Sequence, residues 1–266
     1  MEHEDAAPAD CDQQRVPAGF RVQGSGSAKS NPQSAIPNPQ SAYAAFPRRR
    51  FDGEAIRDAM LAAAGLLDRT AGGPGVMPPL PSELTSTLLK NQWQEDPTDA
   101  NHYRRSIYLF ARRNLRYPLF DTFDRPDANA SCPQRSVSTT ALQSLQMVNS
   151  EFALLCARHL AGQAGGSGFR VRGSGQKPGP SSQGPGERKL VPWLVRRVFN
   201  REATEREVQL LEKFLTDQTD LLRSEGRNAE ELALPIGAEG DDPYAAAALV
   251  DLCLALFNAS EFVTID

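Results

Sequence analysis

The residues that could do chemistry are concentrated in one Pro-broken loop, DTFDRPDANASCPQR, residues 121–135. Its three aspartates are spaced by three, and a cysteine follows them. Carboxylates can act as general acid and base, and a cysteine can act as a nucleophile. The candidate catalytic residues are therefore Asp121, Asp124, Asp127 and Cys132.

A metal site or a bound cofactor is not predicted for this chain. A calcium loop needs a glycine that permits a sharp turn and a distal bidentate glutamate. The loop has Pro126 in place of the glycine and no glutamate at a suitable spacing. The whole chain has three histidines, no Cys-x-x-Cys pair and no Cys-x-x-Cys-His haem-attachment motif.

Arginines near the loop suggest a structural role for its aspartates. Bidentate arginine–carboxylate pairs can fix a loop that lacks regular hydrogen bonds. The net charge of −4 and the pI near 5.5 favour this scaffold over a polyanion-binding face, and no nucleic-acid partner is predicted. The candidate binding residues are Arg112, Arg113, Arg116, Arg125 and Arg135.

The cysteines are interpreted first as inert thiols. A nucleophilic Cys132 would need a general base, and the histidines at 102 and 159 are distant in sequence, although they could be close in space. Cys156 and Cys253 sit among apolar residues, which predicts buried thiols.

Helical spacing of apolar residues dominates the segments that position the loop. The predicted fold is mainly α, an irregular helical domain with at most one or two short strands and long disordered segments. Residues 104–117 favour a short strand buried on both faces, or an extended segment. Helices are predicted over 52–68, 82–93, 118–123, 141–161 and 191–199, and after Thr204 and Asp242.

Capping signals mark the predicted helix ends. Asp52 is a plausible N-cap for the first helix, and glycines 72, 73 and 75 with Pro74 are expected to end it. Thr140 with Gln143, and Thr204 with Glu207, have the spacing of a capping box. Gly162 is expected to end the helix over 141–161, whose predicted apolar face is Leu145, Val148, Phe152 and Leu155.

Composition divides the chain into four parts. Residues 1–46 are predicted to be a disordered low-complexity tail, and 165–187 a Gly/Pro/Ser-rich insert or linker. Residues 47–164 and 188–266 are predicted to be the first and the C-terminal helical part of one domain. No span of about 18 apolar residues and no signal peptide occur, which predicts no membrane span and a cytoplasmic chain as written.

Three strings carry a family resemblance: EAIRDAML, RRSIYLFARRNLRYPLFDTFDRPDANASCPQRSVSTTALQSLQMVNSEF and NASEFVTID. They resemble the planctomycete-specific C-terminal domain of unknown function in exported, cytochrome c-like proteins, over 47–164 and 188–266. The resemblance implies exported relatives with an upstream haem module and a further N-terminal half of the domain. This chain has neither, so it resembles a truncated domain. No catalytic residues are established for the family.

These observations leave three hypotheses. The leading one is a non-catalytic interaction or scaffold module, whose partners are other domains or subunits of a cytochrome-associated extracytoplasmic assembly. The alternative is a polysaccharide- or polyanion-processing enzyme fragment that uses the loop 121–135. The third is a truncated gene product that barely folds. The missing catalytic and metal constellations favour a protein that is not an enzyme.

Overall fold

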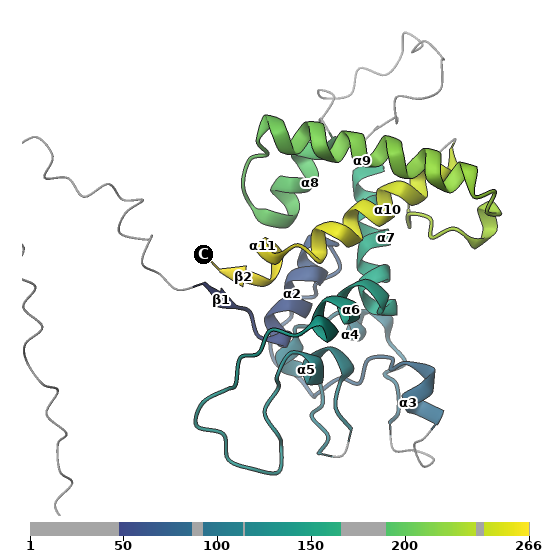
Figure 1. The fold of residues 1–266 in the computed structure, drawn as a ribbon. Coiled ribbons are helices and arrows are strands. Elements are labelled where there is room, and N and C mark those ends of the chain that lie inside the picture. Colours follow the sequence, from purple (N-terminus) through teal and green to yellow (C-terminus); the bar gives the residue numbers. More distant parts are fainter. Residues whose placement is uncertain (1–47, 87–92, 114, 166–189, 238–241, 266) are drawn as a thin grey trace, which may run out of the picture. The chain divides into compact units, whose positions relative to one another are not determined.

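The computed structural model describes residues 48–86, 93–113, 115–165, 190–237 and 242–265, and these are mainly α-helical, as predicted (Figure 1). The predicted tail over 1–46 and nearly all of the predicted insert over 165–187 lie outside these residues. Within the described ranges, no helix has both the length and the apolar character that a membrane crossing needs.

Helix α10 (Pro243–Phe257) is the centre of the packing. Its sequence PYAAAALVDLCLALF is apolar on nearly every face, which is typical of a helix that its neighbours cover all round. Helices α7 (Glu151–Gly165) and α9 (Glu205–Ser224) pack against it (Figure 1). The predicted start is confirmed, because the Asp242 side chain accepts a hydrogen bond of 3.1 Å from the Tyr244 amide. The predicted buried face is also confirmed: Leu249, Leu252, Cys253 and Leu256.

Helix α2 (Gly53–Ala63) is shorter than the helix predicted over 52–68. It ends before Gly65, whose φ of +69° is a conformation that glycine adopts without a Cβ clash. The prediction that residues 72–75 end the helix is therefore wrong. Asp52 makes no capping hydrogen bond with its side chain, although it is the residue that precedes the helix.

The described residues within 104–117 do not form the predicted strand buried on both faces. Ser106–Tyr108 is a 3-10 turn, η2, and the Ile107 side chain on it is 76% exposed. Extended backbone occurs nearby, with isolated bridges between Val76 and Leu109 and between Asp68 and Arg104. The buried Arg104 explains this irregular path, because its guanidinium donates to the carbonyls of Thr70, Gly72 and Pro74.

The two short strands of the described residues lie elsewhere. Strand β1 (Arg49–Arg50) pairs antiparallel with β2 (Thr264–Ile265), with Arg49 opposite Ile265 and Arg50 opposite Thr264. The pairing brings the beginning of the described chain beside its last residues (Figure 1). The C-terminal string that carried part of the family resemblance is thus part of the fold.

The helix predicted over 141–161 is two helices, α6 (Ala141–Asn149) and α7. The break is at Ser150, whose ψ of 136° is extended and whose hydroxyl accepts from the Ala153 amide at 3.1 Å. Leu145 and Val148 are 55% and 40% exposed, while Met147 is buried, so the predicted apolar face of α6 is wrong. A break between two helices rotates the face that each presents to the core.

The remaining helices are ten residues long or shorter. Helix α5 is confirmed near 118–123 and α8 near 191–199. The helix predicted over 82–93 begins at residue 82 as α3, and 87–92 are outside the described residues. These elements are α3 (Ser82–Ser86), α4 (Asp99–His102), α5 (Pro118–Thr122), α8 (Leu190–Phe199), η3 (Ala229–Glu231) and α11 (Ser260–Val263).

Candidate functional site

The Asp124 side chain binds two other segments of the chain, one at Arg50 and one at Ser138. Its carboxylate lies 2.6 Å from Nη2 of Arg50 and accepts from the amide and hydroxyl of Ser138 at 2.8 Å. Partial burial raises the pKa of the Asp124 carboxyl, but the hydrogen bonds from Ser138 and Arg50 outweigh burial and hold the pKa below its usual value. The carboxylate is thus an ionised anchor.

Asp121 and Asp127 share one cation. Arg116 lies 2.7 Å from Asp121 and 3.2 Å from Asp127, and all three side chains are exposed. The Asn129 amide also donates to Asp127 at 3.1 Å, which closes a turn. This hydrogen bond, with the charge of Arg116, holds the pKa of Asp127 below its usual value. The two carboxylates therefore face a guanidinium.

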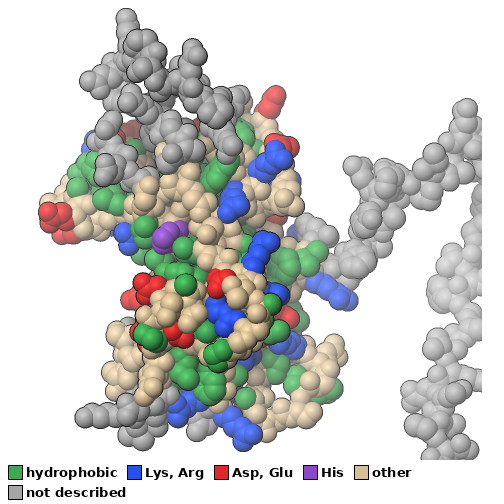
Figure 2. Space-filling model, turned by 180° about the vertical axis from the view of Figure 1, so that it is seen from behind, with side chains coloured by type: hydrophobic (Ala, Val, Ile, Leu, Met, Phe, Trp, Pro, Cys, Tyr) green, Lys and Arg blue, Asp and Glu red, His purple; other side chains and the backbone are tan. Residues whose placement is uncertain are grey.

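The other candidate arginines have separate surroundings. Arg135 lies 3.2 Å from Asp52 and 3.0 Å from Glu54. Arg125, the sequence neighbour of Asp124, instead lies over the Phe120 ring at 5.3 Å. Arg112 is half-buried, and its backbone forms an isolated antiparallel β-bridge with Leu115. Arg113 is exposed. The face seen in Figure 2 likewise shows basic side chains interspersed with acidic and apolar ones.

Cys132 lies on the surface of the loop, and its thiol donates to the Gln134 carbonyl at 3.0 Å. Cys156 and Cys253 are buried, as predicted, and burial raises the pKa of Cys156 to about 12. Where side chains are described, no group of three or more His, Cys, Asp or Glu residues could hold a metal ion. The candidate catalytic side chains are thus distributed over ion pairs and turns.

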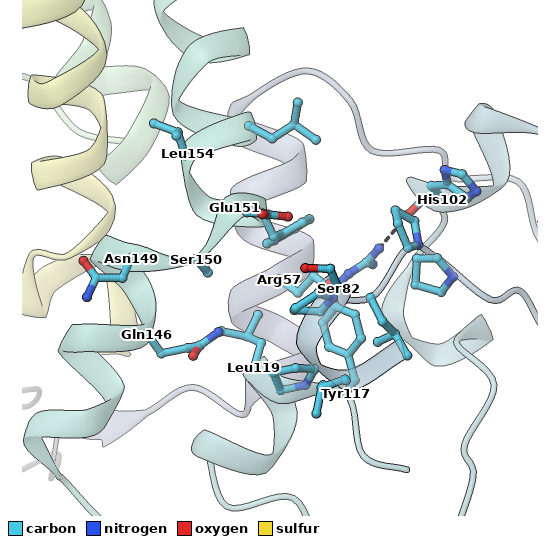
Figure 3. Close-up of a pocket in the computed structure, with 18 of the residues that line it drawn as sticks. Arg57, Ser82, His102, Tyr117, Leu119, Gln146, Asn149, Ser150, Glu151 and Leu154 are labelled. Carbon is cyan, nitrogen blue, oxygen red and sulfur yellow. Dashed lines mark hydrogen bonds between the residues drawn. The ribbon is translucent and has the colours of Figure 1, made fainter. Parts of the chain in front are cut away.

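A cavity that sequence reasoning missed lies beside the α6–α7 junction (Figure 3). Its volume of about 800 Å³ is within the usual range for small-molecule sites. One wall is the proline segment 78–81, and another is the start of α5 with Tyr117 and Leu119. The junction supplies Gln146 and Phe152.

Arg57 of α2 is a fully buried cation in the lining of this cavity, with 1% of its surface exposed. It donates to the carbonyls of His102 at 2.6 Å and Arg104 at 3.0 Å (Figure 3 shows the first bond). Its Cζ lies 5.3 Å from the Phe152 ring centre and 5.8 Å from that of Tyr117. Ring faces and carbonyl dipoles thus surround the charge.

Arg57 forms a long ion pair with its sequence neighbour Asp58. Oδ1 of Asp58 lies 3.9 Å from Nη1 of Arg57. The same oxygen accepts hydrogen bonds from the Ser106 amide and hydroxyl at 2.7 and 2.6 Å. The Nε atom of Arg57 is buried without a hydrogen-bond partner. Buried charges are usually paired at close range, so a buried arginine with a long ion pair and an unsatisfied Nε atom marks a candidate site.

One signal in the sequence could have located this cavity. Arg57 shares helical spacing with Met60, Leu61 and Ala64, all of which are buried. A cation in the middle of a buried apolar stripe needs hydrogen-bond acceptors or an opposite charge inside the fold. The wall made by 78–81 could not be predicted, because it depends on this segment lining the same cavity as α6 and α7, which are distant in sequence.

Comparison with known proteins adds one result. Residues 23–215 match the family model PSD1, described as protein of unknown function (DUF1553). The matched range includes the loop 121–135 and every residue that lines the cavity, and it ends within α9. No curated protein and no solved structure matches the chain.

Proposed function

Because this chain belongs to the PSD1 family of proteins of unknown function (DUF1553), we propose that it is a non-catalytic interaction module that binds a partner through the cavity at the α6–α7 junction. The proposed setting is an extracytoplasmic assembly of a planctomycete, with cytochrome-associated domains or subunits as partners. The resemblance in the sequence supports that setting, and the cavity supports the binding role.

The observation that carries the proposal is an apolar ridge continuous with the cavity. Leu142, Leu145 and Val148 of α6 are 67%, 55% and 40% exposed. At 100° per residue, these three side chains share one side of α6 with Gln146 and Asn149, which line the cavity. Contiguous exposed apolar side chains beside a pocket are typical of a binding surface.

The charges of the loop give less support to the alternative, a polysaccharide- or polyanion-processing enzyme. A general acid in glycoside hydrolysis needs a carboxyl whose pKa is raised. The pKa values of Asp124 and Asp127 are instead lowered by their hydrogen bonds and arginine neighbours. Asp121 shares Arg116 with Asp127, so an arginine occupies the space between these carboxylates.

The test uses the full chain and a matched pair of tryptophan variants on α6. Gln146→Trp places a large side chain at the cavity lip, whereas Ser144→Trp places it at an exposed position of the same helix outside the cavity. Ligand-observed NMR with a mixed set of neutral and charged fragments should detect binding to the native chain and to Ser144→Trp, and its loss in Gln146→Trp.

Two results would contradict the proposal. One is a set of fragments that bind equally well to both tryptophan variants, because the cavity would then not be the binding site. The other is cleavage of a polysaccharide by the native chain that Asp121→Asn or Asp127→Asn abolishes, because the loop would then be an active site.

A further inference from the structure

We infer that the cavity binds a monocarboxylate with an apolar body, an inference that rests on the proposed binding role. The carboxylate could belong to a free organic acid or to the C-terminus of a polypeptide, and both present the same chemistry to the cavity. Three features of the lining support this ligand class: a fully buried arginine with an unsatisfied Nε atom, the start of a 15-residue helix, and a predominantly apolar wall.

The first feature is the charge balance around Arg57. Both of its terminal nitrogens already donate to protein oxygens, and its Nε atom is buried without a partner. Its ion pair with Asp58 is 3.9 Å long, and Asp58 also accepts from Ser106 and pairs with Arg105 at 3.9 Å. The charged side chains of the lining are Arg57, Arg158 and Glu151, so two cations against one anion leave one net positive charge. One negative charge on the ligand balances it, which favours a monoanion over a phosphate dianion.

The second feature is the N-terminus of α7, which lines the same cavity. The amides of Ala153 and Leu154 bond to the hydroxyl and the carbonyl of Ser150. Those of Glu151 and Phe152 precede the first intrahelical bond, so two N–H donors remain at the cavity. The helix dipole adds partial positive charge at this end of α7. Phe152, in its first turn, places its ring centre 5.3 Å from the Cζ atom of Arg57.

The third feature is the apolar wall, which suits the body of the ligand. Prolines and large apolar side chains make most of it, with a few polar groups among them. The lining also holds one negative charge, which would repel a carboxylate: Glu151, exposed in the first turn of α7. His102 and Arg158 line the cavity as well. The apolar residues of the wall include Pro78, Pro79, Leu119, Phe152, Leu154 and Leu155.

A native tryptophan can report binding. Trp93 donates through Nε1 to the Pro78 carbonyl at 2.9 Å, and Pro78 lines the cavity. The chain has two tryptophans, so Trp193→Phe leaves Trp93 as the single indole. Titration of this full-length variant with 4-phenylbutanoate, and with 4-phenylbutanamide as the neutral isostere, should show about tenfold tighter binding of the acid.

A second pair of probes separates the two sources of carboxylate. A hexapeptide ending in leucine is compared with the same peptide carrying a C-terminal amide. If the free peptide binds tighter than phenylbutanoate, the occupant is a polypeptide terminus; if only phenylbutanoate binds, it is a free acid. Both results support a carboxylate site.

The charge of Glu151 gives an independent test that does not disturb the buried arginine. Glu151→Gln removes the opposing charge and should tighten acid binding about threefold while leaving amide binding unchanged. Glu205→Gln, in the first turn of α9 and outside the cavity, is the matched control and should change neither.

The failures of the two proposals differ. Equal affinity of acid and amide, or an unchanged acid affinity in Glu151→Gln, overturns the carboxylate inference and leaves the binding module standing. If neither these probes nor any fragment binds in the cavity, both proposals are wrong.

Discussion

Nη2 of Arg50 lies 2.6 Å from Oδ2 of Asp124, across a sequence separation of 74 residues. Arg50 is in β1, which pairs with the C-terminal β2, and Asp124 follows α5. One carboxylate therefore connects the sheet to the loop 121–135. Asp124 has a φ of +60°, a region that aspartate and asparagine enter more readily than most residues.

Replacement of this carboxylate should destabilise the fold. Asp124→Asn keeps the size and tolerates the positive φ, but it removes the charge that Arg50 and Ser138 bind. We expect a loss of about 2 kcal/mol in the free energy of unfolding, measured by urea denaturation at pH 7. Asp127→Asn, at an exposed ion pair, is the control and should cost less than about 1 kcal/mol.

The pH dependence of Asp124 follows from the direction of its pKa shift. Its folded pKa lies below the usual value of 3.8, so the stabilisation is present above 3.8 and is lost as the pH falls through the folded pKa. The difference between the native chain and Asp124→Asn should therefore shrink in acid. If the difference in the free energy of unfolding between the two proteins stayed constant as the pH fell below 3.8, Asp124 would not be an ionised anchor.

The corrected face of α6 gives a prediction with a large contrast. Met147 is 1% exposed and Leu145 is 55% exposed. Met147→Ala should lower the free energy of unfolding by about 3 kcal/mol, because it leaves a cavity in the core. Leu145→Ala should change it by less than about 0.5 kcal/mol. Comparable losses in the two variants, measured by chemical denaturation, would restore the face first predicted from the sequence.

Local chemistry explains which parts of the fold could be predicted. Thr204 and Glu207 form the expected capping box within four residues, and Asp242 starts α10 through a bond to a neighbouring amide. The face of α6 depends instead on a break at Ser150 and on what covers the helix. A continuous 3.6-residue pattern across that break could not show the change of direction.

In the candidate site too, contacts between residues close in sequence could be predicted, and contacts between distant segments could not. That the aspartates of the loop lie beside arginines could be expected from composition, and Arg116 between Asp121 and Asp127 is close in sequence. The partner of Asp124 could not be expected, because β1 is distant in sequence. The cavity requires α2, α5, α7 and the segment 78–81 to meet, which is a tertiary relationship without a sequence motif.

Gly162 lies inside α7, which continues to Gly165, so the prediction that Gly162 ends a helix is wrong. Alanine at this position should have the reverse of its usual effect in a helix. Glycine to alanine normally stabilises a helix interior by about 1 kcal/mol. A Cβ at Gly162 would lie 1.9 Å from the Ile236 carbonyl oxygen, which approaches α7 closely. Gly162→Ala should therefore destabilise the protein by about 2 kcal/mol in thermal or urea unfolding.

A matched control for that prediction is Ser144→Ala, at an exposed position of α6. It adds the same helix-favouring residue without a neighbour to displace, so the free energy of unfolding should rise by a few tenths of a kcal/mol. A stabilising Gly162→Ala would show that the segment around Ile236 does not pack on α7 in solution.

The ion pairs of Arg201 should make the free energy of unfolding fall as the pH is lowered. Arg201 lies 2.6 Å from Glu207 at the start of α9 and 2.5 Å from Glu261 of α11. Hydrogen bonds from Arg201, and from Thr204, lower the pKa of Glu207 from 4.5 to about 2. Since the folded pKa is depressed, the stabilisation is present above 4.5 and is lost as the pH falls toward 2.

Glu207→Gln isolates the charge, because glutamine keeps the capping-box geometry at this position. The variant should be less stable than the native chain by up to about 1 kcal/mol at pH 7, and the gap should close between pH 4.5 and 2 in urea denaturation. Glu202→Gln, whose partner Arg196 is 72% exposed, should show no such closure. A gap that widened in acid would mean that Glu207 is not the ionised partner of Arg201.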